Sequence, residues 1–172
     1  SDGAKLDGFG QAVAIDGDTL LAGAYKHDAG GTNAGAVYVF TRSGTVWTEQ
    51  AKLQPPGGSG GAWFGYAVAL EGDRALVGAP FDPSTSSGAG YVFERLGTTW
   101  SQVAHLAPAA GATSDAIGFS VALDGNFAVL GALWDDDAGL DAGAVVPYLR
   151  TGPVWTEEPV LTAAGAEPND RF

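Results

Sequence analysis

The fold is decided by residues 64–93, which read FGYAVALEGDRALVGAPFDPSTSSGAGYVF. Small and branched residues follow Gly65, and the pair Glu71-Gly72 then interrupts the apolar pattern. An acidic residue followed by glycine supplies the positive φ of a tight turn, so we expect an antiparallel hairpin whose first strand lies near residues 65–70. The second strand, around Leu76-Val77, is apolar on both faces, as expected of a strand that lies between two neighbouring sheets.

The same pattern occurs three times in the 172 residues. Gly-Ala pairs recur at spacings of 55 and 53 residues, while arginines and tryptophans recur at spacings of 53 and 55. The recurring residues are the pairs that begin at Gly23, Gly78 and Gly131, the arginines Arg42, Arg95 and Arg150, and the tryptophans Trp47, Trp100 and Trp155. A fixed period in this range is typical of repeat architectures. Each copy contains four strand patterns and no helical one.

Four antiparallel strands in each copy predict an all-β fold made of β-propeller blades. We expect inner strands near residues 10–15, 65–70 and 118–123, and blades over about 9–54, 64–107 and 117–162, with 163–172 as the start of a further repeat. A plain sandwich of the same strands is the alternative, but sandwiches seldom repeat their sequence so faithfully. Pro147 removes a backbone donor from the third strand of the last copy, so that strand should be bulged or unpaired at one edge.

Composition and charge exclude several classes of function. The chain has 8 Lys and Arg against 20 Asp and Glu, a formal net charge of −12, so nucleic acid is disfavoured as a partner. It has no cysteine, which excludes thiol catalysis, disulfides and thiolate metal sites. No run of apolar residues is long enough to insert into a membrane, and the first residues lack the pattern of a signal peptide.

The repeated motifs identify a family by resemblance. Phe64-Gly65, then Gly78-Ala79-Pro80, and the Gly-Ala-Val-Tyr-Val-Phe run of residues 35–40 resemble the FG-GAP repeat of integrin α-subunit propellers and of many secreted or surface bacterial proteins. The resemblance covers essentially the whole chain, although the last copy has Ile117 in place of Phe and Leu133 in place of Pro. Because such propellers usually have seven blades, the chain resembles somewhat under half of one. The resemblance implies an extracellular or cell-surface location.

One loop has the composition of a calcium site. Between the second and third strands of the last copy, carboxylates stand at Asp135, Asp137 and Asp141, and Gly139 allows a sharp turn. Hard oxygen ligands in alternate positions suit Ca²⁺. The resemblance adds that FG-GAP loops often bind calcium at this place. The alternative is a loop whose acidic residues only interact with water.

Each recurring arginine precedes a recurring tryptophan by five residues across a hairpin, as Arg42 precedes Trp47. One interpretation is a cation–π contact within the hairpin, worth about 0.5–1 kcal/mol. The other is a periodic, ligand-facing aromatic site for glycans formed by all six residues. Lectin propellers of integrin-like topology bind glycans between blades, so the resemblance supports this alternative.

The sequence contains no recognisable catalytic constellation. The only histidines, His27 and His105, fall at unrelated positions of their copies, and carboxylates two residues apart in an acidic loop are more often ligands than a glycosidase pair. We therefore expect a protein that is not an enzyme. Two hypotheses remain: a structural or adhesive interaction module stiffened by calcium, and a carbohydrate-binding propeller.

Three blades alone would leave two apolar faces without a neighbour. Soluble monomers avoid large apolar patches of this kind. We therefore expect a protein partner at these faces, either the remaining blades of a parent chain or a second copy in a homo-oligomer.

Overall fold

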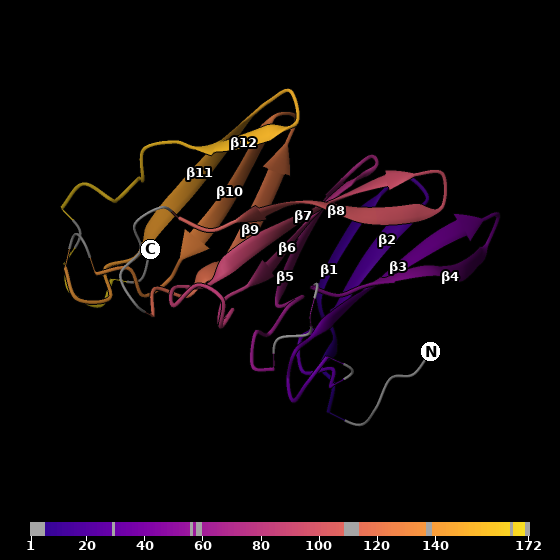
Figure 1. Cartoon of the computed structure of the whole chain (residues 1–172), viewed down its shortest axis with the longest axis horizontal. Coiled ribbons are helices and arrows are strands. Elements are labelled where there is room, and N and C mark those ends of the chain that lie inside the picture. The colour runs from indigo at the N-terminus through magenta and orange to yellow at the C-terminus, as the bar shows by residue number, and fades with distance from the viewer. Residues whose placement is uncertain are drawn as a thin grey trace.

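The computed structural model describes residues 6–28, 30–55, 57, 60–108, 114–136, 139–165 and 167–170. The strands in this part of the chain form three four-stranded antiparallel sheets, which Figure 1 shows side by side from indigo to yellow. Within these ranges there is no helix long and apolar enough to span a membrane. The sheets confirm the all-β prediction and are consistent with propeller blades.

Each copy of the repeat supplies one blade, with its strands in chain order across the sheet. Blade 1 contains β1 (Phe9–Asp16), β2 (Thr19–Ala24), β3 (Ala36–Ser43) and β4 (Val46–Leu53). Blade 2 contains β5 (Ala67–Glu71), β6 (Arg74–Ala79), β7 (Ala89–Leu96) and β8 (Thr99–Leu106). Blade 3 contains β9 (Ile117–Asp124), β10 (Phe127–Ala132), β11 (Ala144–Thr151) and β12 (Val154–Glu157). The inner strands β1, β5 and β9 lie within two residues of their expected positions.

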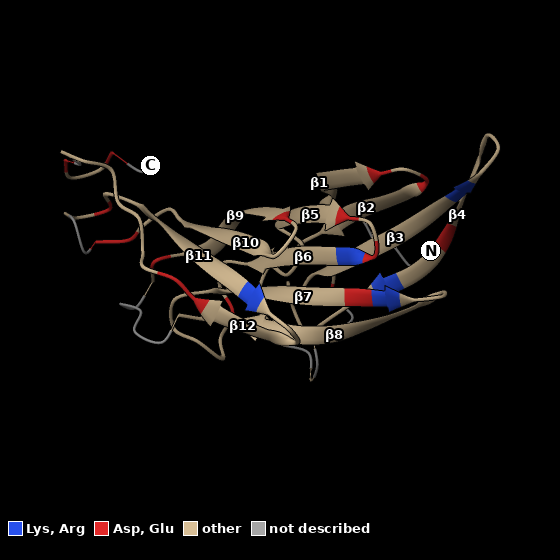
Figure 2. Cartoon of the chain, turned by 90° about the horizontal axis from the view of Figure 1, so that it is seen from above, with Lys and Arg blue, Asp and Glu red and all other residues tan. Residues whose placement is uncertain are grey.

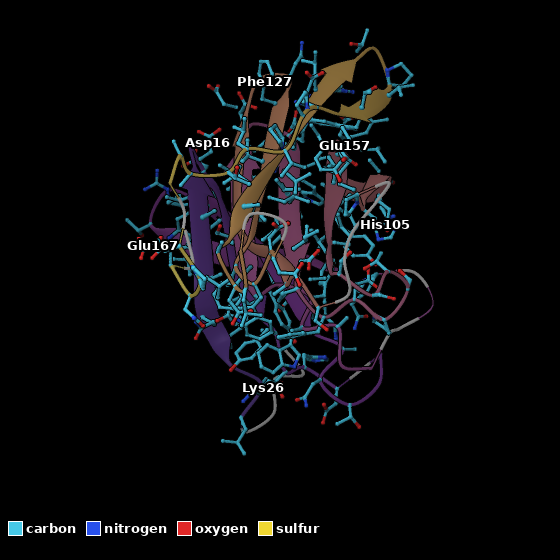
Figure 3. All side chains as sticks on the ribbon, turned by 90° about the vertical axis from the view of Figure 1, so that its left-hand side faces the viewer. Asp16, Lys26, His105, Phe127, Glu157 and Glu167 are labelled. Carbon is cyan, nitrogen blue, oxygen red and sulfur yellow. The ribbon has the colours of Figure 1, made fainter. Side chains whose placement is uncertain are left out.

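The blades have two ends of different character. The hairpin turns between the first and second strands lie at one end, which we call the hairpin end. The loops 25–34, 80–87 and 133–142, which join the second strand to the third, lie at the other end, which we call the loop end. Figure 3 shows Asp16 and Phe127 at the hairpin end and Lys26 at the loop end.

Two layers of the core lie between the blades, and a small third cluster around Tyr38 lies on the outer face of blade 1. The layer between blades 1 and 2 is built on Leu21, Val39, Phe64, Val77 and Phe93. The layer between blades 2 and 3 is built on Leu76, Val92, Ile117, Leu130 and Tyr148. Alternate residues of β6 thus face opposite neighbours, which explains why this strand is apolar on both sides.

Pro147 does not interrupt β11, which pairs with β10 without a register shift through Val129 and Pro147. The effect falls on the other edge, where the ladder with β12 stops at Tyr148 and Glu157. Pairing returns only at an isolated bridge between Val145 and Leu161. The β12 edge is therefore irregular at Pro147, but β3–β4 and β7–β8 shift register at the equivalent residues Val39 and Val92, so the irregularity belongs to the repeat and not to proline alone.

Residues 163–172 were expected to begin a further repeat. The described part of this segment forms no strand, and Phe172 lies outside the described residues.

Candidate functional site

The joint between two blades is formed by the Phe-Gly motif of the later blade. Phe64 lies at the entry to blade 2, and its ring packs against Tyr91 and Phe93 with centroids 5.4 and 6.0 Å apart. The motif also forms a parallel bridge to Gly35 of blade 1, in which the Phe64 amide donates to the Ala34 carbonyl at 3.0 Å. Phe64 is therefore a wedge that fills the space between the two sheets.

Glycines allow the backbones of neighbouring blades to meet. A Cβ at Gly23 of β2 would lie closer than 3.0 Å to the carbonyl oxygen of Gly65, and a Cβ at Gly78 would collide with Gly118 in the same way. The Gly-Ala and Phe-Gly motifs therefore recur because one contacts the other across the joint, where only glycine fits.

The Phe-Gly motif of blade 1 is open to solvent in this structure. Phe9 contacts Tyr38 and Phe40 of its own blade, as Phe64 does in blade 2. The exposed fraction of Phe9 is 56%, whereas that of Phe64 is 0% and that of Ile117 is 2%. Further apolar side chains on β1 are open to solvent, because Val13 is 66% and Ile15 is 63% exposed.

Blade 3 is open on the opposite face. Its residues Val129, Val145 and Pro147 hold the positions that Leu76, Gly90 and Val92 hold in blade 2, and all three are only partly buried. Leu161, which pairs with Val145, is 58% exposed, whereas its counterpart Leu106 is buried. The two open faces are therefore the two halves of one type of joint.

Acidic residues of the hairpin turns also join the blades. The Asp16 carboxylate accepts a hydrogen bond from the amide of Gly72 at 2.6 Å, and Glu71 accepts from the amide of Gly125 at 2.9 and 3.0 Å. Asp124 holds the same turn position in blade 3. The periodic acid-glycine turns thus link each blade to the next as well as closing a hairpin.

Two of the three recurring arginines make the expected cation–π contact within their hairpin. The Arg42 guanidinium lies 5.6 Å from the centre of the Trp47 ring, and that of Arg95 lies 5.2 Å from the Trp100 ring. Both arginines also pair with the aspartate that follows the turn glycine, Asp18 at 2.7 Å and Asp73 at 2.6 Å. Figure 2 shows basic and acidic bands side by side on β6 and β7 at this end.

The third pair differs from this pattern. Arg150 has Asn126 where the other copies have an aspartate, and it pairs instead with Glu94 of blade 2 at 2.9 Å. Trp155 lies under the Arg74 guanidinium, 5.8 Å from its ring centre. The predicted cation–π contact between Arg150 and Trp155 is therefore not formed. Because Asn126 carries no charge, Arg150 pairs with an acid of the neighbouring blade instead.

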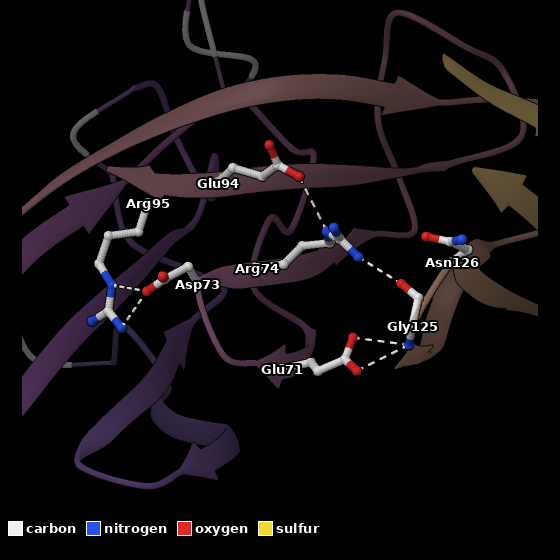
Figure 4. A pocket seen from close by; sticks show the side chains of 7 residues that line it. All are labelled: Glu71, Asp73, Arg74, Glu94, Arg95, Gly125 and Asn126. Carbon is white, nitrogen blue, oxygen red and sulfur yellow. Dashed lines mark hydrogen bonds and ion pairs between the residues drawn. The ribbon is translucent and has the colours of Figure 1, made fainter. Parts of the chain in front are cut away.

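Arg74 and Arg95 border a cavity of about 410 Å³ between blades 2 and 3 at the hairpin end (Figure 4). Arg74 donates to Glu94 at 3.2 Å and to the Gly125 carbonyl at 2.6 Å. Arg95 pairs with Asp73 on the opposite wall. Each guanidinium is thus already paired with an oxygen of the chain, and the indole of Trp100 donates to Gln50 of blade 1 at 3.0 Å. Whether the six Arg and Trp residues face a glycan stays a prediction.

The loop end contains a buried polar cluster in blade 2. Asp82, which is 2% exposed, accepts hydrogen bonds from the Tyr91 hydroxyl and from the Ser84 amide, the latter at 2.9 Å. His105 Nε2 lies 3.2 Å from the same carboxylate. Burial alone would raise the pKa of Asp82, but the hydrogen bonds from His105, Tyr91 and Ser84 outweigh it and lower this pKa to about 2. Burial and the neighbouring carboxylate raise the pKa of Tyr91 well above its usual range.

Blade 1 has a related cluster of different charge. His27 holds the loop position of Asp82, and Lys52 holds the strand position of His105. Lys52 Nζ and His27 Nε2 are 3.3 Å apart, and the His27 ring lies 6.0 Å from that of Tyr38. The two histidines thus hold different positions of their copies, as expected, but each belongs to the corresponding polar cluster of its blade.

The acidic loop of blade 3 turns back on itself. The amide of Gly143 donates to the Asp135 carbonyl at 3.0 Å, and Gly139 and Asp141 adopt positive φ values of 153° and 51°. Asp135 is buried at the base of the loop, and Asp137 lies outside the described residues. Among the residues that the structure does describe, no three acidic or histidine side chains form a metal-binding group. Calcium binding stays a prediction.

The sequence reasoning missed a continuous row of partly exposed aromatic rings that crosses all three blades at the loop end. Tyr25 contacts Trp63 and Tyr66 with centroids 5.1 and 5.4 Å apart. Trp63 contacts Phe81 at 4.7 Å. The row continues from Tyr66 to Phe119 at 4.6 Å and from Phe81 to Trp134 at 5.7 Å. A signal was present, because blades 2 and 3 both have an aromatic residue directly after the Phe-Gly position and two residues after Gly-Ala.

Comparison with known protein families agrees with this arrangement. A family model described as the FG-GAP repeat matches residues 1–40, 47–93 and 100–146, which is more than half of the chain. No curated protein matches the sequence. FG-GAP repeats are a non-enzymatic structural repeat type that forms propeller-type interaction modules, and they occur mostly in extracellular or cell-surface proteins. Three repeats are matched, and the second and third each run from the fourth strand of one blade to the third strand of the next, so the chain belongs to the FG-GAP repeat family.

Proposed function

We propose that this chain is a non-enzymatic interaction module of a secreted or cell-surface protein, and that its two open faces bind further FG-GAP blades. The observation that carries this proposal is the exposure of Phe9, at 56%, in a position where Phe64 is 0% exposed. Burying such a ring contributes about 1.5–3 kcal/mol to the free energy of association, so the exposed Phe9 ring favours binding of a further blade.

The two open faces are complementary to each other. The face of blade 3 has the glycine of the joint, Gly131, and the turn carboxylate of Asp124, while blade 1 offers Phe9 and the turn glycine Gly17. These are the groups that meet in the two internal joints of the chain. Head-to-tail contact between different surfaces produces a ring when the rotation closes, and a ring leaves no face open. Blades of a parent chain and blades of a second copy would use the same contacts.

Sedimentation velocity of the chain at micromolar concentration tests this proposal. We expect concentration-dependent association that Phe9→Asp abolishes, because the substitution would bury a charge in the apolar joint between two blades. Leu96→Asp is the matched control, since Leu96 is 88% exposed in the β7–β8 hairpin, away from both open faces. A stable monomer of 17.4 kDa that no substitution alters would disprove the proposal.

We also propose that Ca²⁺ stabilises the acidic loop of blade 3. The positive φ values of Gly139 and Asp141 and the closure of Gly143 onto Asp135 bring the two ends of the loop together, which suits carboxylate ligands that surround one cation. Ca²⁺ should raise the melting temperature of the wild type, because it binds the folded loop only. Asp141→Asn and Asp137→Ala should remove this shift, whereas Asp18→Asn at the hairpin end should retain it. An unchanged melting temperature in the wild type would show that the loop is merely acidic.

A further inference from the structure

The aromatic row at the loop end borders a second cavity, and we propose that this cavity binds a neutral carbohydrate. The cavity measures about 480 Å³ and lies where loop 25–34 of blade 1 meets the entry to blade 2. Its lining combines two apolar side chains with five polar residues: Leu6, Trp63, Asp7, Lys26, Asp28, Thr32 and Asn33. A concave site that combines an aromatic surface with a few polar groups is the usual form of a small-molecule site.

Backbone hydrogen bonds hold the two walls of this cavity in place. The amide of Trp63 donates to the Asn33 carbonyl at 3.2 Å, and the amide of Gly61 donates to the Thr32 carbonyl at 2.8 Å. Asp28 Oδ1 accepts from the amide of Asn33 at 2.8 Å, which fixes this carboxylate at the rim. The site is therefore already formed within one chain, so a ligand would not have to order it.

The backbone at Trp63 is left-handed, and the ring that it carries packs on Tyr25 and Phe81 at the edge of the cavity. Trp63 has a φ of 55°, and the same position has a φ of 69° in Gly8 and 55° in Ala116. The repeat thus requires a left-handed residue here, a conformation that glycine adopts without cost and a bulky residue does not. Residues held in such conformations gather at ligand sites, where the surrounding structure maintains the strain.

The chemistry of the lining favours a neutral sugar. A sugar ring presents C–H groups on one face, which pack on an aromatic ring, and hydroxyl groups at its edge, which need donors and acceptors. Lys26, Asp28 and the Thr32 hydroxyl supply such groups around Trp63. The net charge of −12 disfavours acidic glycans.

This site is separate from the recurring Arg and Trp residues, which lie at the hairpin end. It is also independent of blade assembly, because all its lining residues lie between Leu6 and Trp63 of one chain. Its failure would therefore leave the proposed assembly unaffected.

Calorimetric titration of the full chain with neutral trisaccharides of glucose, galactose, mannose and N-acetylglucosamine tests the proposal. We expect at least one of them to bind, and Trp63→Gly to weaken that binding by about tenfold or more through loss of the ring contact. Glycine suits the left-handed backbone, so this variant should fold. Trp47→Ala, which removes a partly exposed indole at the hairpin end, should bind like the wild type.

Asp28→Asn provides a second variant in case Trp63→Gly is unstable. Its amide oxygen can still accept the bond from the Asn33 amide, while the charge at the rim is lost. We expect a weaker affinity at an unchanged melting temperature. The proposal is wrong if none of the trisaccharides binds at millimolar concentration, if Trp63→Gly and Asp28→Asn bind as the wild type does, or if Trp47→Ala alone loses binding.

Discussion

Single residues of this repeat make both local and long-range hydrogen bonds, and Asp82 is the clearest case. It lies in the loop that follows β6, yet its carboxylate is satisfied by Tyr91 on β7 and by His105 on β8. A buried carboxylate stays charged only when such donors surround it. Asp82 therefore anchors loop 80–87 to the outer strands of its own blade.

The lowered pKa of Asp82 makes part of the stability dependent on pH. Because its folded pKa of about 2 lies below the ordinary value of 3.8, the charged form stabilises the fold above pH 4, and this contribution is lost as the pH falls from about 4 to about 2. Asp82→Asn should reduce the free energy of unfolding by about 2 kcal/mol at pH 7. Urea unfolding at pH 7 and pH 3 measures this, and the gap between variant and wild type should narrow at pH 3.

Glu49→Gln is the control for this experiment, since Glu49 is exposed on β4. It should unfold like the wild type at pH 7. An equal loss of stability in both variants, or a gap for Asp82→Asn that does not change with pH, would contradict the role assigned to Asp82.

At the scale of elements, the second strand of each blade is defined by its neighbour. The strands β2 and β6 place Gly23 and Gly78 against the carbonyl oxygens of Gly65 and Gly118 in the next blade. The strand β10 has Gly131 in the same position, but the nearest atom to its added Cβ is the side-chain oxygen of Ser120 within the same blade. The glycine of the Gly-Ala motif therefore packs against the backbone of the next blade in β2 and β6, but only against a side chain of its own blade in β10.

Two alanine substitutions at this position should therefore differ. Gly78→Ala should lower the free energy of unfolding by about 3 kcal/mol or more. Its new Cβ would meet backbone that cannot move without separating blades 2 and 3. Gly131→Ala should lower the free energy of unfolding by less than about 1 kcal/mol, since the Ser120 side chain can rotate away from the new methyl group. Chemical denaturation of the two variants side by side measures this. Equal losses would show that the glycine serves the strand itself and not the joint.

At the scale of the whole molecule, the three blades form an open arc that ends in two halves of a joint. Every internal joint uses a Phe-Gly wedge, a glycine contact and a turn carboxylate, and the open faces carry the same groups without partners from a further blade. A repeat array that contacts only its neighbours is stable when both its ends are covered.

Gly131→Ala should consequently weaken self-association while it leaves the fold intact. If the face of blade 3 receives blade 1 in the geometry of the internal joints, the new methyl group will collide with the incoming backbone as it would at Gly23. Sedimentation velocity should show a monomer for this variant at concentrations where the wild type associates. The exposed control Leu96→Ser should associate normally. Undiminished association of Gly131→Ala would indicate a contact of a different geometry.

The sequence by itself determined the number of blades, their strands and their turns. The period of the Gly-Ala pairs and the acid-glycine turns are local or repeated signals, and the strands β1 to β12 follow them closely. The irregular edge at Pro147 was expected from the proline, but the register shifts at Val39 and Val92 show that the repeat produces it without one.

Only the tertiary structure decided which of these residues meet. Asp82 and His105 are 23 residues apart, and the aromatic row runs from Tyr25 to Trp134, so no short-range pattern predicts either contact. Arg150 crosses to Glu94 because Asn126 offers no charge, a choice that depends on the neighbouring blade. Strand patterns arise from the local backbone, whereas these contacts arise where blades stack, and their partners become adjacent only after that stacking.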